Sequence, residues 1–426
     1  MATSFATVPL KAVIKPEPFT VSIPEVLLSE FKQLLKLSKV GPVTYEGLQQ
    51  DRKYGITTEW LKDAKEQWES FDWREVENEI NSVPNFKAQV EDSGANDKSG
   101  TGHTYTIHFA ALFSQREDAV PILMLHGWPG SFLEFLPILK RLQSAYATPS
   151  ELPYHIIVPS LPGYAFSSPP PLDRDFRLED CARILDKLMV QLGFGLNSGD
   201  GSKGVHGGYV VQGGDVGSKV ARVLGGSSVH KAVRAVHLNF SIMPDPKSGS
   251  GESTPADAYN EAEKAGLERA AWFSRLGSAY AVLHATKPST IGLALSTNPL
   301  ALLAWVGEKF LDWTDADPPL AAILESVTLY WLTECFATSL WPYRQLFTPG
   351  VIGAHENPAW HIHKPLGMSW FPFEIAPVPR AWTATTGDLV FFRQHSSGGH
   401  FAAMERPDVL LADLEEFVEQ VWPTLE

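Results

Sequence analysis

The N-terminal part of the chain carries apolar residues at helical spacing. In residues 19–39 a proline at position 24 precedes apolar side chains three and four positions apart, and residues 60–82 have the same character. This spacing is typical of amphipathic helices, and a proline suits the first turn of a helix. Residues 91–102 form a polar stretch with Gly and Ser, typical of a loop. The pattern predicts a mainly helical segment, residues 1–100, that wraps the domain that follows.

From residue 105 the pattern changes to short apolar runs that alternate with amphipathic stretches. Residues 178–192 have helical spacing, and a second helical pattern follows residue 215. The apolar runs have the length of buried strands: 105–110, 120–125, 155–159, 209–211 and 233–239. Strands that alternate with helices are typical of a parallel sheet covered on both faces. The pattern therefore predicts an α/β fold whose core begins at residues 101–240.

The alternation stops after residue 239. Residues 244–255 are rich in Ser, Gly and Pro, and the helical pattern that follows continues to about residue 343. The most apolar part, residues 291–310, is interrupted at 296–299, whereas a membrane-spanning helix needs about 20 predominantly apolar residues. We interpret residues 241–365 as a helical lid inserted into the core. A strand at 385–393 and an amphipathic helix at 408–422 complete the core, residues 366–426.

Composition excludes several classes of partner. The chain has 426 residues, 44% of them hydrophobic, and a formal net charge of −14, so nucleic acid and anionic membranes would repel it. Cys181 and Cys335 match no metal spacing and form no disulfide framework, which is typical of a reducing compartment. Residues 1–18 lack the apolar centre of a signal peptide. We expect a soluble, cytoplasmic protein without a membrane anchor, metal or organic cofactor.

A candidate nucleophile follows the strand at 209–211. Gly213-Gly214-Asp215-Val216-Gly217 resembles the sharp turn that exposes the nucleophile of α/β-hydrolases, with Asp in place of the usual Ser. A carboxylate needs no base to activate it, and attack on a saturated carbon would form an alkyl ester that water must cleave. Because Gly and Asp are also the commonest turn residues, a plain surface turn is the alternative.

The loop after residues 120–125 supports the first interpretation. It reads His126-Gly127-Trp128-Pro129-Gly130-Ser131, where an α/β-hydrolase supplies one backbone N–H of its oxyanion hole. The second N–H comes from the residue after the nucleophile. The predicted donors are Trp128 and Val216. The alternative is an ordinary end of a strand, because Gly and Pro commonly end strands.

A base and an acid are expected after the lid. His400 follows the last predicted strand in the required chain order, and its flanking glycines favour it over His395. For the acid that orients the base, Glu374 fits the end of the preceding strand, whereas Asp388 suits a turn. His361 and His363 have no third metal ligand nearby.

These motifs together resemble the microsomal type of epoxide hydrolase, in particular its soluble, fungal-like members. The resemblance extends nearly from end to end of the chain. It is carried by residues 19–24, 126–131, 161–164, 213–218, 371–374 and 398–407. It implies hydrolysis of a small-molecule epoxide by water to a vicinal diol, and it makes a homodimer plausible.

The resemblance also implies two lid tyrosines that donate hydrogen bonds to the epoxide oxygen. They correspond best to Tyr280 and Tyr343, with Tyr330 as the rival for the second role. A phenol of pKa about 10 stays protonated at neutral pH and can donate such bonds. A lid tyrosine could equally be a packing residue whose hydroxyl is satisfied locally.

The substrate pocket is expected to include His126, Pro129 and Phe401. One departure from the family is Val216, where many members carry Trp; a smaller side chain would reshape the pocket floor. The haloalkane dehalogenases share the Asp, His and acid arrangement and bind halide through indole N–H groups, so Trp128 leaves that alternative open. A catalytically silent hydrolase fold that only binds ligands is the alternative from another class.

Overall fold

A computed structural model describes residues 4–92, 102–196, 207–248, 255, 258–347 and 355–425. Within them, nine strands form one sheet in the order β1-β2-β3-β5-β4-β6-β7-β8-β9. The six strands from β5 to β9 are parallel, and β1, β2 and β3 pair antiparallel at one side. Their bounds are β1 Glu17–Phe19, β2 Asn85–Asp92, β3 His103–Leu112, β4 Val120–Leu125, β5 Tyr154–Pro159, β6 Tyr209–Gly213, β7 Val233–Leu238, β8 Ile362–Trp370 and β9 Gly387–Gln394.

The central strands are covered on both faces. Every residue of β4, β5 and β6 is buried, as expected for parallel strands between two helical layers. Val236 of β7 lies against Gly225 of α6, while its neighbour His237 packs on Phe417 of α14 with ring centroids 5.5 Å apart. Because successive side chains of a strand point to opposite faces, α6 and α14 cover opposite sides of the sheet.

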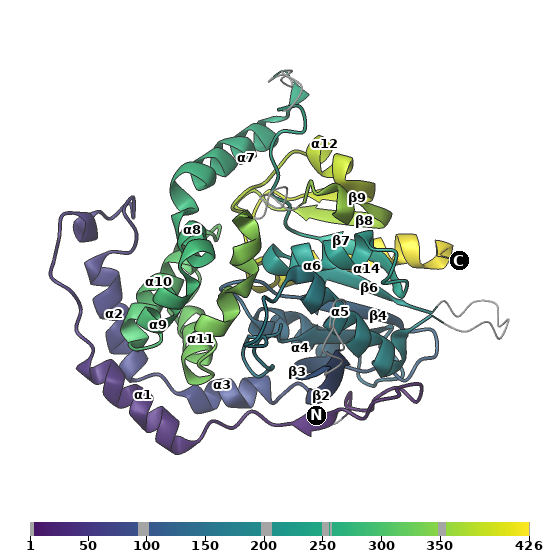
Figure 1. Ribbon diagram of the computed structural model, residues 1–426, viewed down its shortest axis with the longest axis horizontal. Helices are drawn as coiled ribbons and strands as arrows, with labels where there is room; N and C mark the ends of the chain where they lie inside the picture. Colours follow the sequence, from purple (N-terminus) through teal and green to yellow (C-terminus); the bar gives the residue numbers. More distant parts are fainter. Residues whose placement is uncertain are drawn as a thin grey trace.

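The core helices are α4, α5 and α6 in the first part and α12, α13 and α14 in the last (Figure 1). α4 packs with α14, and α5 with α6. Their bounds are α4 Leu136–Ala145, α5 Leu178–Met189, α6 Asp215–Gly226, α12 Arg380–Thr383, α13 Ala402–Glu405 and α14 Pro407–Val421. The α/β fold with a mostly parallel sheet is therefore confirmed. The predicted Gly/Ser-rich loop at 197–204 lies outside the described residues.

The N-terminal segment is mainly helical, but it also supplies β1 and β2. These two strands were not predicted; the eight residues of β2 pair along β3, so the segment is part of the sheet as well as a wrapping. Its helices are α1 Glu25–Leu37, α2 Thr58–Glu69 and α3 Trp73–Ile80. They lie along the lid helices (Figure 1), where the Trp68 indole N–H donates to Thr328 Oγ1 at 2.8 Å.

The lid is inserted between β7 and β8. Its helices are α7 Glu261–Trp272, α8 Ala279–Thr286, α9 Pro288–Leu295, α10 Pro299–Asp312 and α11 Leu320–Leu332, followed by a 3-10 segment, Ala337–Phe347. The expected lid boundary at residue 365 was a few residues late, because β8 begins at Ile362.

The apolar stretch 291–310 is broken between α9 and α10. There the Asn298 side chain accepts a hydrogen bond from the Ala301 N–H at 3.1 Å and starts a new helix. Among the described residues, no single helix is long and apolar enough to cross a membrane. Two sharply bent helix pairs, one of them α9 with α10, meet the length and composition test only when joined.

Candidate active site

Asp215 occupies the turn between β6 and α6. Its φ of 44° lies in the left-handed region, which a residue with a side chain adopts only when its surroundings enforce it. Close packing of backbone enforces it here. A Cβ on Gly217 would lie 2.2 Å from the Leu125 carbonyl oxygen, and one on Gly127 would lie 2.3 Å from the Asp215 side chain. These glycines are required because any larger residue would separate the turn from the loop after β4.

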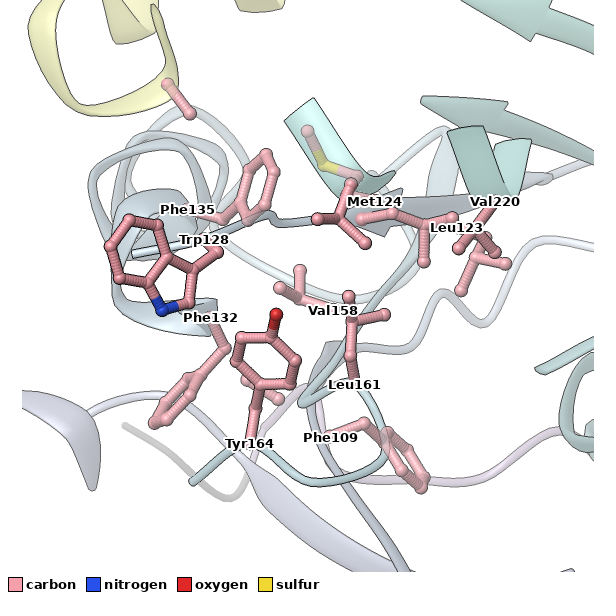
Figure 2. Close-up of a cluster of buried hydrophobic side chains, with 14 of the residues drawn as sticks. Phe109, Leu123, Met124, Trp128, Phe132, Phe135, Val158, Leu161, Tyr164 and Val220 are labelled. Atoms are coloured by element: carbon pink, nitrogen blue, oxygen red, sulfur yellow. The ribbon is translucent and has the colours of Figure 1, made fainter. Parts of the chain in front are cut away.

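Backbone N–H groups hold the Asp215 carboxylate. The Trp128 N–H donates to Oδ1 at 2.7 Å, and the Val216 N–H is a second donor to the carboxylate. The Trp128 side chain is fully buried and belongs to the hydrophobic cluster that includes Phe132 and Phe135 (Figure 2). The loop that carries the first donor is therefore anchored in the core, which fixes the position of the N–H group.

His400 lies between Asp215 and Glu374. Its Nε2 is 3.4 Å from Asp215 Oδ2, and its Nδ1 is 2.5 Å from Glu374 Oε1. The same glutamate oxygen accepts the Ile375 N–H at 2.6 Å. Because His400 and Glu374 are both buried, the glutamate holds the imidazole in one orientation toward Asp215.

The two rival residues lie elsewhere. His395 Nε2 pairs with Asp413 Oδ2 of α14 at 2.6 Å, and Asp388 is exposed at the start of β9. His400 reaches the site because its backbone N–H donates to the Trp313 carbonyl of the lid at 2.9 Å. This bond holds the loop after β9 over the sharp turn that bears Asp215, the nucleophile elbow.

The neighbouring charges and hydrogen bonds determine the protonation of Asp215 and His400. Burial favours the neutral form of Asp215, yet hydrogen bonds from His400 and from the Trp128 and Val216 N–H groups keep its pKa below the usual value. Burial would also lower the pKa of His400, but the charges of Glu374 and Asp215 and their hydrogen bonds raise it to about 10. At neutral pH an imidazolium therefore stands between two carboxylates.

A cavity of about 310 Å³ opens onto Asp215, with Tyr280 of α8 and Tyr343 of the 3-10 segment in its wall. Their hydroxyls share a hydrogen bond, and burial raises the pKa of both well above 10, so both stay protonated. The Tyr280 ring stacks on Trp128 with centroids 5.3 Å apart. Tyr330 is not in the described lining, and its hydroxyl donates to the Gly130 carbonyl at 2.8 Å.

Of the expected pocket residues, His126 and Phe401 line a small void beside Asp215, whereas neither they nor Pro129 belong to the described lining of the larger cavity. Both ring nitrogens of His126 face backbone: Nδ1 lies 3.0 Å from the Gly127 carbonyl and Nε2 accepts the Leu161 N–H. Phe401 stacks on Phe310 with centroids 4.4 Å apart. Their positions beside the motifs are explained by packing that holds the nucleophile and base loops.

Two residues near Asp215 were missed in the sequence. Glu134 and His400 both line a second, small void of about 10 Å³ beside Asp215, the size of one water molecule. Burial raises the pKa of Glu134 to about 8. Lys219 lies in the wall of the large cavity. Glu134 follows Ser131 at the spacing of a helix capping box, and Lys219 is one polar residue in a helix, so neither had a distinguishing signal.

The described residues offer no metal site. In the described ranges no group of three or more His, Cys, Asp or Glu side chains could hold a metal ion, and Cys181 and Cys335 are both buried and unpaired. The rings of Trp128 and Trp313 each lie 5.3 Å from the Tyr280 ring, but neither tryptophan belongs to the described lining of the large cavity.

The chain is similar to known proteins over nearly its whole length. Residues 16–135 match the family model described as the epoxide hydrolase N terminus, and residues 120–197 match the alpha/beta hydrolase fold. The structure of the Aspergillus niger epoxide hydrolase is 50% identical with a TM-score of 0.87, covering 99% of this chain and 100% of that chain. A relative from Dothistroma septosporum, named "Putative epoxide hydrolase", is 44% identical over 97% of this chain and 92% of its own length.

The fold and the match at its core define an enzyme of the α/β-hydrolase class. Within that class the chain belongs to the epoxide hydrolase family, as its similarity to fungal members over nearly the whole length shows. The general activity of the family is the hydrolysis of epoxides.

Proposed function

We propose that the chain hydrolyses epoxides to vicinal diols through an ester of Asp215. The observation that carries the proposal is the state of the Asp215 carboxylate: two backbone N–H groups bind it, and it shares a cavity with two tyrosine hydroxyls. With Oδ1 held by the Trp128 N–H, Oδ2, which faces His400 Nε2, is the attacking oxygen. A carboxylate beside proton donors suits attack on a strained ether carbon.

In the first step Oδ2 forms a bond to an epoxide carbon as the ring C–O bond breaks. Tyr280 or Tyr343 gives its proton to the departing oxygen, which becomes the hydroxyl of an enzyme-bound hydroxyalkyl ester. The tyrosinate then recovers a proton from the imidazolium of His400. This transfer leaves His400 neutral, which is the form that a general base requires.

The electrostatics support this order of steps. Esterification removes the negative charge of Asp215, one of the two carboxylates that raise the pKa of His400 to about 10. The pKa of His400 therefore falls once the ester has formed, and the base becomes available only when there is an ester to cleave.

In the second step His400 takes a proton from water, and the hydroxide attacks the carbonyl carbon of Asp215. The negative charge develops on Oδ1, to which the Trp128 N–H already donates, and the Val216 N–H is a second donor to the same carboxylate. The alkoxide leaves and takes the proton that remains on the new carboxylic acid group of Asp215, which gives the diol and restores the Asp215 carboxylate and the His400 imidazolium. The void beside Asp215, lined also by His400 and Glu134, suits the attacking water, and a protonated Glu134 would add one hydrogen bond to it.

A single turnover of racemic styrene oxide in oxygen-18 water tests the proposal. The diol of the first turnover should be unlabelled, because its new oxygen comes from Asp215, and the label should enter Asp215. Labelled diol in that turnover would show direct attack by water and refute the ester. A complete lack of diol from styrene oxide and other epoxides would refute the activity for this chain.

A further inference from the structure

A cationic side chain lines the cavity that contains Asp215. Lys219 follows Asp215 by four residues on α6, and among the described lining residues it is the only lysine or arginine. Residues four apart lie on one face of a helix, with Cβ atoms about 5–6 Å apart. Helical side chains also lean toward the N-terminus. The stem of Lys219 therefore leads back toward the turn that bears the nucleophile.

The ammonium of Lys219 has hydrogen-bonding capacity to spare. In the part of the chain that the structure describes, no hydrogen bond or ion pair to Lys219 is formed. Burial lowers its pKa, opposed by the charges of Asp215 and Glu356. Asp215 is already bound by His400 and the backbone N–H groups. A partly desolvated cation without a bonded partner gains most from a negatively charged ligand.

Apart from Asp215, the described wall offers Lys219 no negative charge. It is mostly apolar, with Phe240, Ile242, Phe273, Val282 and Ile375 among its residues. A lysine in such a wall weakens the binding of purely hydrocarbon epoxides, because the ammonium must lose water without a partner. The charge is therefore best explained by a group on the substrate.

We propose that Lys219 is an anion subsite, and that this chain prefers epoxides that carry a carboxylate several bonds from the ring. The inference rests on the proposed function. A carboxylate matches one ammonium in charge and fits with an alkyl chain into a cavity of about 310 Å³. The separation is needed because a carboxylate on the ring itself would approach the negative charge of Asp215.

Initial rates of diol formation from 5,6-epoxyhexanoate and from neutral 1,2-epoxyhexane test the subsite. The measured quantity is the ratio of the two kcat/KM values for the intact chain, Lys219→Met and Lys219→Arg. Lys231→Met is the matched control, because Lys231 is exposed at the opposite end of the neighbouring strand β7. It removes the same charge from the protein without touching the cavity.

The unaltered chain should favour the carboxylate at least about tenfold, a gap that corresponds to one charge-assisted hydrogen bond. The preference should vanish in Lys219→Met, mainly through KM, and persist in Lys219→Arg and Lys231→Met. If the kcat/KM for 5,6-epoxyhexanoate were equal to or lower than that for 1,2-epoxyhexane, and Lys219→Met did not change the ratio, the subsite would be overturned. Diol formed from 1,2-epoxyhexane would still support the proposed function. Loss of the preference in Lys231→Met as well would assign it to overall charge and overturn the subsite. If neither epoxide gave diol, the proposed function would fail first.

Discussion

Replacement of His400 by Gln should separate the two chemical steps. Asp215 needs no base to attack, so the ester still forms, whereas its cleavage loses the group whose Nε2 lies 3.4 Å from Asp215 Oδ2. Loss of a positioned general base costs about 10²–10⁴-fold in the step it serves. If the two steps have similar rates in the unaltered enzyme, a 100-fold slower second step leaves about 99% of the protein as ester.

Mass spectrometry of the intact protein, quenched after mixing with styrene oxide, measures that fraction. The expected spectrum shows nearly all His400→Gln protein heavier by one substrate, and peptide mapping should place the addition on Asp215. A double variant that also carries Asp215→Ala should show no addition.

His395→Gln is the matched control for this experiment. His395 is the nearest rival in sequence, and it pairs with Asp413 rather than with Asp215. Its replacement should leave ester turnover at the normal rate. An inactive His400→Gln protein without the added mass, or accumulation of ester in His395→Gln, would refute the assignment of the base.

Three further outcomes are expected. Tyr280→Phe and Tyr343→Phe should each slow ester formation about 10–100-fold in stopped-flow single turnovers. Tyr330→Phe should leave that rate unchanged and lower stability by about 1–3 kcal/mol in urea unfolding, because the buried Gly130 carbonyl loses its donor. Equal effects of all three replacements on the rate would argue against the tyrosine pair. The pKa of the base histidine is raised from 6.5 to about 10, so its ion pairs stabilise the fold fully below pH 6.5 and are lost as the pH rises through 10. Glu374→Gln should therefore flatten the decline of unfolding free energy over that window, and identical pH slopes would contradict the ion pair. Gly217→Ala should lower stability by about 1–3 kcal/mol and abolish activity, because its Cβ would lie 2.2 Å from a backbone oxygen of β4. An unchanged melting temperature would show that the turn at Asp215 can relax.

The elements of the core could be predicted from the chain alone because their signals are local. The strand at Val120–Leu125 is a short apolar run, and the helix Pro407–Val421 repeats apolar residues at helical spacing. Strand β2 was missed, because it depends on pairing with β3 rather than on an apolar run of its own. The sequence Asn85–Asp92 includes several polar residues.

The chain by itself also determined the chemistry available near the elbow. The reaction class is limited by three features that depend only on residue type and chain order. They are a glycine-rich turn with Asp215 at its apex, a second loop that offers backbone N–H groups, and histidines and acids in order after the lid. Tertiary structure decided which members of this set meet. His400 rather than His395 faces Asp215, and Tyr343 rather than Tyr330 enters the cavity.

The physical reason is that pocket membership depends on contacts between segments far apart in sequence. His126 lines the small void beside Asp215 but not the large cavity, and both of its ring nitrogens face backbone groups. Lys219 looked like an ordinary helical lysine until the lid closed an apolar wall around it. Local patterns specify elements and residue types, whereas the side chains that share one cavity are selected only when the sheet, the lid and the N-terminal segment pack together.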